Sequence, residues 1–263
     1  METDLLAWSV QQFQTFLLIL MRVACILFMM PLFGTRNVPT LVKIGLSMIV
    51  SLLLLPVVRM HVPFFPTEPI HFVFFMILEA LTGFLLALSV RIVFGGVQLA
   101  GEFVSYKTGL AMARTVDPQS GTTSTVITEL YYFFALLVFM SIDGHHWFFK
   151  ALVQSFRVLP PGGLVLREAL HRYFLASAGR MFVVAIEISA PILAILILAQ
   201  VAMGIVARVV PQINILITSF PLTISLGFIF IGLSLDLLVP YLRGLFEESG
   251  RSMVTVILPL MAR

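Results

Sequence analysis

The amino-acid sequence predicts an all-α, membrane-associated protein made of many helices. Only 11% of its 263 residues are charged, whereas 60% are hydrophobic, and a soluble globular domain carries about 25% charged residues. The mean hydropathy of +1.07 indicates surroundings of lipid or of other apolar protein. Apolar segments of roughly 20 residues, the length that a helix needs to cross a membrane, recur along the chain. Because the sequence lacks the alternation of a membrane β-barrel, the spans are expected to be helices.

These apolar segments follow one another along the whole chain, and proline or glycine separates most of them. The six candidate spans are residues 5–31, 40–58, 70–94, 126–142, 181–206 and 213–239. A cleavable signal peptide is not expected, because Glu2 and Asp4 stand where basic residues are required. Residues 164–180 predict an amphipathic helix at a lipid or protein interface, because apolar residues recur there at helical spacing opposite charged ones.

A charged residue interrupts three of the candidate spans well inside their ends. Arg22 lies in the first span, Glu79 in the third and Glu187 in the fifth. A charge at the centre of a lipid-facing helix costs at least about 2.5–3.5 kcal/mol. The helix faces that carry these charges are therefore expected to meet protein or water rather than lipid.

Two stripes of small residues predict close helix packing. The first runs along the third span at steps of four residues: Glu79, Gly83, Ala87, Arg91 and Gly95. Its two charges lie about 18 Å apart, at 1.5 Å per residue, so each needs a partner elsewhere. A structural packing face is favoured over an ion or proton pathway. The second stripe, Ser219, Thr223 and Gly227 in the last span, is expected to be a helix contact.

The sequence predicts no catalytic, cofactor or metal site. His145 and His146 follow Asp143, but no cysteine joins them, and neighbouring residues on a helix point about 100° apart. Ser120 has no histidine in the same polar region to activate it. The phosphate-binding motif GxxxxGK[ST] and the nucleophile motif GxSxG do not occur. The pI near 9.3 comes from scattered basic residues, so a nucleic-acid surface is not expected either.

A polar loop interrupts the apolar sequence near its centre: KTGLAMARTVDPQSGTTS, residues 107–124. Five glycines lie between Phe94 and Val126. Irregular backbone at membrane depth is tolerated only where protein buries it or where it lines a water-filled cavity. An ordinary solvent-exposed loop is the alternative, but the small, apolar stretch GLAMA (109–113) argues against it. The favoured interpretation is a loop that lines a pore.

Two long blocks of sequence carry a resemblance to a known family. The first is EALTGFLLALSVR (79–91) followed by GGVQLAGEFVSYKTGLAMARTVDPQSG (95–121), and the second is APILAILILAQVAMGIVARVVPQINILITSFPLTISLG (190–227). Together with MRVACILFMMPLFGTRNVPTLVKIGLS (21–47), they resemble the FliR family of flagellar export proteins and its counterpart in virulence-type injectisomes. The resemblance covers essentially the whole chain, and the closeness of both blocks favours the flagellar form.

The resemblance implies a core subunit of the type III export gate in the bacterial inner membrane, at the flagellar basal body. Members of that family assemble with the FliP and FliQ families in a helical hetero-oligomer, with FlhB at its cytoplasmic entrance, and unfolded flagellar subunits pass through the channel. The resemblance further implies stacked helical hairpins, without enzymatic activity. Residues 1–180 would form a FliP-like part that contains the central loop, and residues 181–263 would form a FliQ-like hairpin with a C-terminal tail.

The resemblance also assigns residues to three roles. The central loop, from about residue 106 to 121, would plug the channel with Tyr106, Gly109, Leu110, Met112, Val116, Asp117, Pro118 and Gly121. The hairpin turn would face the cytoplasmic entrance and contains Arg208, Pro211, Gln212 and Asn214. The residues expected to pack or pair across subunit boundaries are Arg22, Glu79, Gly83, Arg91, Glu102 and Glu187.

Two other functions compete with an export subunit. A secondary transporter would use Glu79, Glu102 and Glu187 for ion coupling, but such transporters show internal repeats with paired broken helices. The only internal similarity in this sequence is a pair of R-x-x-P turns, at 36–39 and 208–211. This pair is expected of stacked hairpins as much as of a transporter repeat. An intramembrane enzyme ranks third, because no nucleophile stands beside a base.

Overall fold

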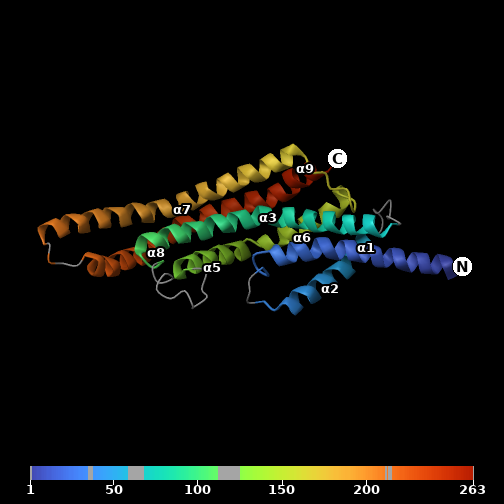
Figure 1. Ribbon diagram of the computed structural model, residues 1–263, viewed down its shortest axis with the longest axis horizontal. Helices are drawn as coiled ribbons and strands as arrows, with labels where there is room; N and C mark the ends of the chain where they lie inside the picture. Colours follow the sequence, from blue (N-terminus) through green and yellow to red (C-terminus); the bar gives the residue numbers. More distant parts are fainter. Residues whose placement is uncertain are drawn as a thin grey trace. The chain divides into compact units, whose positions relative to one another are not determined.

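The computed structural model describes residues 2–34, 38–58, 68–111, 125–210, 212 and 215–262. Within these ranges all regular secondary structure is helical, which confirms the predicted all-α class. The elements are α1 (Glu2–Met29), α2 (Thr40–Val58), α3 (Pro69–Thr108), α5 (Val126–Ser141), α6 (Gly144–Val158), α7 (Glu168–Val209), α8 (Ile215–Ser252), the π-helical turn η3 (Met253–Ile257) and α9 (Leu258–Met261), as Figure 1 shows.

The described helices provide fewer membrane spans than the six that the sequence predicts. Four helical stretches are long and apolar enough to cross a membrane: Val10–Met29, Pro69–Thr108, Glu168–Val209 and Thr218–Met261. The bent pair α5 and α6 makes a fifth if it counts as one span. Apolar helix Thr40–Pro56 is too short to belong to this group. The long helices also extend beyond their apolar segments. Helix α3, for example, continues through the polar residues Glu102 and Lys107 after its apolar run ends.

Two elements differ from the prediction. The amphipathic segment 164–180 is not a separate helix, because its residues from Glu168 onward form the start of the continuous helix α7. Helix α6 was not predicted, although its sequence carries a signal. Its buried residues recur at helical spacing: Gly144, Phe148, Ala151, Leu152, Ser155 and Phe156. The apolar residues are interrupted by histidine, lysine and arginine, so this stretch stands out less than the long apolar runs.

The chain divides into two compact units, each assembled from separated stretches of sequence. The first unit contains residues 1–91, 143–177 and 246–263, and the second contains residues 92–142 and 178–245. Helices α3, α7 and α8 each contribute residues to both units. The predicted boundary at residue 180 concerns likeness to other subunits, and it stays a prediction.

The core of the first unit forms where α1 meets the first half of α3. Leu18, Ile19 and Val23 of α1 are fully buried. Helix α2 lies beside α1 (Figure 1). At Gly83 of α3, a Cβ atom would lie 2.5 Å from the carbonyl oxygen of Arg22, so only glycine allows the two helices to approach this closely. The small-residue stripe of α3 thus packs against α1 at Gly83, whereas Gly95 at its end lies against Met181 of α7.

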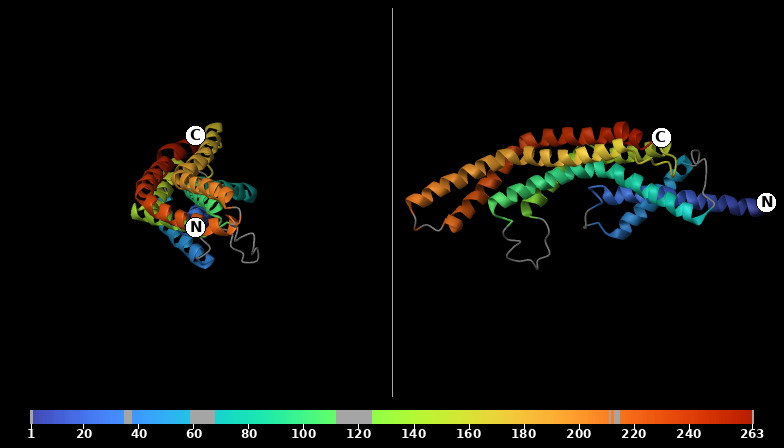
Figure 2. Two further views of the ribbon diagram at one scale, coloured as in Figure 1. Left: turned by 90° about the vertical axis from the view of Figure 1, so that its left-hand side faces the viewer. Right: turned by 45° about the horizontal axis from the view of Figure 1, so that its top comes forward.

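The second unit joins the end of α3 to α5 and to a helical hairpin. Phe94 of α3 packs against Tyr132 and Phe139 of α5, with ring centroids 5.6 and 5.7 Å apart. Helices α7 and α8 run side by side as the hairpin (Figure 2). Large apolar side chains such as Leu198 and Leu237 stay exposed on the hairpin. That surface suits lipid or another protein.

Candidate functional site

The second unit holds the two ends of the central loop, and we call the residues around them the loop base: Ser105, Lys107, Thr108, Gly109, Thr125, Thr128, Gln200 and Thr223. Helix α3 ends at Thr108, and Gly109 follows with φ of 88°, a left-handed conformation that glycine adopts without strain. The last carbonyl groups of a helix have no partner inside that helix. Other groups must therefore satisfy Lys107 and Thr108.

Both helices of the hairpin supply those partners. The Gln200 side chain of α7 donates from Nε2 to the carbonyl oxygen of Lys107 at 3.2 Å. The Thr223 hydroxyl of α8 lies 3.1 Å from the carbonyl oxygen of Thr108, and Thr108 is fully buried. Lys107 Nζ returns a hydrogen bond to Gln200 Oε1 at 3.4 Å. The end of α3 is capped by side chains that lie far along the sequence.

The residue that follows the loop, Thr125, also bonds to the end of α3. Thr125 caps the start of α5, and its side-chain oxygen accepts from the backbone N–H of Thr128 at 3.3 Å. The hydroxyl groups of Thr125 and Ser105 of α3 lie 2.5 Å apart, and the Thr125 and Thr128 hydroxyl groups lie 2.8 Å apart. All three side chains are buried. These hydrogen bonds hold Ser105 and Thr125, which flank the loop, next to each other.

The small-residue stripe of α8 is the surface on which the loop base rests, so the predicted helix contact is confirmed. A Cβ atom at Gly227 would lie 2.6 Å from the Thr108 side chain. The Phe220 ring lies against Gly109, where an added Cβ would collide with it. Ala111, three residues into the loop from Thr108, is buried, and its N–H donates to the Ser105 carbonyl at 3.3 Å.

The substitution Thr223→Val is expected to weaken the loop base while it keeps the side-chain shape. It removes the hydroxyl group shared by the carbonyls of Thr108, Ser219 and Phe220. We expect the free energy of unfolding to fall by about 1–2 kcal/mol, because the buried Thr108 carbonyl loses its donor. Proteolysis within the loop should become faster. Unchanged unfolding and unchanged proteolysis would show that the hydroxyl group does not hold the loop base.

The structure describes only some of the residues predicted for the plug and for the hairpin turn. Tyr106 belongs to α3 and is 68% exposed, and Gly109 and Leu110 follow the helix end. Arg208 lies in the last turn of α7, and Gln212 lies exposed in the turn after it. The predicted residues outside the described part of the chain are Met112, Val116, Asp117, Pro118, Gly121, Pro211 and Asn214.

A buried ion pair in the first unit joins two of the charges predicted to face other subunits. Arg22 Nε of α1 lies 2.6 Å from Glu79 Oε2 of α3, and both side chains are 1% exposed. The other carboxylate oxygen, Oε1, accepts from the backbone N–H of Gly162 at 2.9 Å. Both carboxylate oxygens thus have a donor. The expectation that these two charges pair across a subunit boundary is wrong, because each satisfies the other within one chain.

The remaining donors of the Arg22 guanidinium bind helix α6 and the residue after it. Nη1 donates to Ser155 Oγ at 2.9 Å, and Nη2 donates to the Leu159 carbonyl at 3.2 Å. The guanidinium carbon lies 4.2 Å from the centre of the Phe156 ring, a cation–π contact. Arg22 therefore joins α1, α3 and α6 around one buried charge.

The other predicted subunit-packing residues have different surroundings. Gly83 packs on α1 within the chain. Arg91 is exposed, and its Nη1 lies 3.5 Å from the Met29 carbonyl. Glu102 is half-buried on α3. Glu187 is exposed on α7 and accepts a short hydrogen bond from the Tyr241 hydroxyl of α8. Packing of these residues against other subunits stays a prediction.

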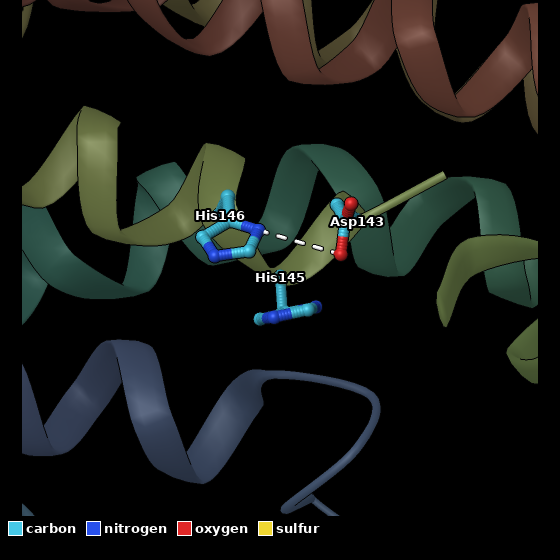
Figure 3. Close-up of side chains that lie close together, drawn as sticks. All are labelled: Asp143, His145 and His146. Atoms are coloured by element: carbon cyan, nitrogen blue, oxygen red, sulfur yellow. Dashed lines mark ion pairs between the residues drawn. The ribbon is translucent and has the colours of Figure 1, made fainter. Parts of the chain in front are cut away.

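Asp143, His145 and His146 gather three possible metal-ligand atoms within 4.8 Å of one another at the start of α6 (Figure 3). His146 Nδ1 lies 3.6 Å from Asp143 Oδ1, and both side chains are largely exposed. Ligands of one tetrahedral zinc ion lie about 3.3 Å apart, as bonds of about 2.0 Å require. The N-terminal end of a helix also carries partial positive charge. The three side chains would have to move together to hold an ion, so the cluster is not a preformed metal site.

The arrangement defines a class of protein: a helical membrane protein with a central polar loop that begins at a helix end capped by the protein's own apolar hairpin. The family described as bacterial export proteins, family 1, matches residues 13–249. The chain therefore belongs to the bacterial export proteins, family 1.

Individual relatives agree with this assignment over nearly their whole length. The flagellar biosynthetic protein FliR of Bacillus subtilis is 31% identical, over 93% of this chain and 96% of its own. FliR of Pectobacterium carotovorum is 31% identical over 93% of this chain and 92% of its own. FliR of Escherichia coli is 29% identical over 92% and 93%. The predicted resemblance is thus confirmed.

Proposed function

We propose that the chain is a core subunit of the flagellar type III export gate, located in the inner membrane at the flagellar basal body and needed for flagellum assembly. With subunits of the FliP and FliQ families it forms the channel through which unfolded flagellar subunits leave the cytoplasm. The family match over residues 13–249 supports an export function. The names of the relatives, flagellar biosynthetic proteins, support the flagellar system.

The observation that carries the proposal is the loop base. A plug must block the channel when no substrate is present, and it must move aside when a substrate passes. The buried hydrogen bonds among Ser105, Thr125 and Thr128 hold both ends of the loop together. The contacts of Thr108 with Thr223 and Gly227 seat the loop on the hairpin. The residues that flank the loop are therefore held in place, which supports a plug that moves about fixed ends.

The hairpin supplies surfaces for partner subunits. Its outward side chains include Leu198, Ile205 and Leu233, which are all exposed. Exposed apolar patches of this kind mark sites of contact with protein or lipid. We place the FliP and FliQ subunits against these surfaces, and FlhB near the turn after Arg208 at the cytoplasmic entrance.

An ion-coupled transporter fits the described charges less well. An ion-coupling carboxylate must release its partner and meet water during the cycle. Glu79 is instead fully buried, and Arg22 and Gly162 occupy its two oxygens. This geometry favours a structural role for the charge that the transporter alternative needs most.

Deletion of residues 109–118 tests the plug directly. In cells that also express the FliP-like and FliQ-like subunits, we expect the deletion to make the membrane leak small ions, because the channel loses its barrier. The measurement is the rate at which a membrane potential collapses. The matched control is the same deletion without the partner subunits, where no channel forms and no leak is expected. A tight membrane around an assembled gate that carries the deletion would contradict the plug role.

Native mass spectrometry tests the gate itself. The tagged chain is expressed with its neighbouring genes and purified in mild detergent. We expect one defined complex that contains FliP-like and FliQ-like subunits. A chain that emerges alone, or as a homodimer, would contradict the proposed function.

A further inference from the structure

The chain passes from one compact unit to the other at four positions, which we call the crossings, and a glycine lies close to each of them. Three crossings lie inside the continuous helices α3, α7 and α8, after Arg91, Ser177 and Leu245. The fourth lies between α5 and α6, after Ile142. The glycines are Gly95 and Gly96 in α3, Gly144 at the start of α6, Gly179 in α7 and Gly244 in α8.

Local packing explains the glycines at two of the crossings. A Cβ atom at Gly96 would lie 3.0 Å from the carbonyl oxygen of Met181 in α7, and one at Gly95 would lie 3.1 Å from the sulfur atom of Met181. Glycine therefore lets α3 and α7 approach each other within the second unit. Gly144 is buried at the bend between α5 and α6, directly after Asp143, whose φ is 54°. These three glycines need no further explanation.

Packing within the chain does not explain Gly179 and Gly244. Both are exposed, and a Cβ atom at either position would meet no atom within 4 Å. Alanine would fit at both positions and would make the helices more stable, because glycine loses more backbone freedom on folding. In α8, Pro240 lies one turn before Gly244 and has no N–H, so the helix also lacks a backbone hydrogen bond there. Helices α7 and α8 are thus weakened beside their crossings.

The hydrogen bonds that hold each unit together lie on one side of the crossings. In the first unit, Arg22 binds Glu79 and Ser155. In the second unit, Thr223 binds the carbonyl of Thr108. Each of these bonds joins residues of the same unit, so a bend of α7 and α8 at their crossings would leave all of them intact.

We propose that Gly179 and Gly244 are hinge points at which α7 and α8 bend, so that the two compact units move as separate bodies during export. The proposal rests on the function proposed above, because it assigns the motion to an export step. Helices bend sharply where a backbone hydrogen bond is missing or where a residue tolerates non-helical angles, and proline and glycine meet these conditions. In the structure both helices are continuous through these glycines, which is the unbent state.

Distance measurements on the purified full chain test the motion itself. With Cys25 replaced by serine, spin labels are attached at Leu41→Cys of α2 and Leu198→Cys of α7. Both positions are exposed, the first in the first unit and the second in the second unit. Pulsed electron double resonance should show two populations of label distances. We expect the double variant Gly179→Ala with Gly244→Ala to reduce the smaller population about tenfold, because alanine keeps both helices unbent.

Gly204→Ala with Gly232→Ala is the matched control. These glycines lie in the same two helices, are exposed and have no atom within 4 Å of an added Cβ, but they lie within the second unit and away from the crossings. Both pairs of substitutions should raise the unfolding temperature alike. Only the pair at the crossings should change the distances. Equal changes from both pairs, or a single narrow distance in the wild-type chain, would overturn the hinge.

The yield of co-purified partner subunits distinguishes a hinge from a packing face. An exposed glycine also lets a helix of another subunit approach closely. In the co-expressed gate, we expect Gly179→Ala with Gly244→Ala to bring down as much partner subunit as the wild-type chain. A loss of partner subunits from this pair, without a loss from the control pair, would assign the glycines to a subunit contact and overturn the proposal.

Secretion from living cells tests the use of the motion. In a cell whose own copy of the gene is deleted, we expect Gly179→Ala with Gly244→Ala to secrete flagellar subunits about tenfold more slowly than the wild-type chain, because fewer chains reach the bent state. The control pair should secrete at the wild-type rate. Normal secretion by the variant whose smaller distance population is lost would overturn the role of the hinge in export. Failure of the wild-type chain to restore secretion would instead contradict the proposed function, and the distance measurement would still decide the hinge.

Discussion

Glu79→Leu is expected to lower the free energy of unfolding by about 3–5 kcal/mol, because it leaves the buried Arg22 guanidinium without its counter-charge. Arg22 is 1% exposed and bound on three sides, so it cannot turn toward water without opening the contact between α1 and α3. The expected result is less folded chain and less assembled gate, with no change in ion conduction. Thermal unfolding in detergent and the yield of co-purified partners measure these two effects.

The double substitution Arg22→Met with Glu79→Leu is the control for this prediction. Replacing both members of a buried ion pair with apolar groups is often close to neutral. We therefore expect the double variant to regain more than half of the stability that Glu79→Leu loses. Part of the loss remains, because the Gly162 N–H no longer has its acceptor. A double variant as unstable as the sum of the two single variants would contradict the coupling.

Gly101→Ala is expected to separate α3 from α5 at the loop base. A Cβ atom at this position would lie 2.7 Å from the Cα atom of Thr128, which is backbone and cannot turn aside. Overpacking of this kind costs about 1–3 kcal/mol. The shift should also lengthen the contact between the Ser105 and Thr125 hydroxyl groups. We expect a lower unfolding temperature and, in the assembled gate, a leak of small ions.

Gly232→Ala is the matched control for this substitution. Gly232 lies within α8, and a Cβ atom there would meet no other atom within 4 Å. Alanine favours a helix over glycine by about 0.5–1 kcal/mol, so the isolated chain should become slightly more stable. If Gly101→Ala stabilises the chain as Gly232→Ala does, α3 and α5 do not meet as closely as the loop base requires.

Local sequence patterns predicted the helices well and their contacts only in part. The apolar runs in α1 and α3 are long, and their length alone indicates helices. The stripe through Gly83 predicted a packing face. Its partner, α1, was not predictable, because the pairing of Arg22 with Glu79 spans 57 positions and follows no fixed spacing. Three-dimensional folding, rather than periodicity, brings those two charges together.

The loop base was likewise only partly predictable from the sequence. Glycines and polar residues predicted the loop, and the stripe through Thr223 predicted a helix contact. The sequence analysis does not single out Gln200. A single glutamine inside an apolar span nevertheless indicates that its side chain has a polar partner, here the Lys107 carbonyl. The sequence of α3 does not predict which later helix caps its last carbonyl groups. The capping residues are set by the way in which the hairpin of α7 and α8 packs against the end of α3.

The capping of α3 by the hairpin also has a consequence for synthesis of the chain. Thr223 lies 115 positions after Thr108, the residue whose carbonyl it caps. At a translation rate of about 5–20 residues per second, the hairpin follows the end of α3 from the ribosome by roughly 6–23 seconds. During that interval the newly made loop has neither Gln200 nor Thr223 to hold it. The end of α3 can therefore gain both of its caps only after Thr223 of the 263-residue chain has been translated.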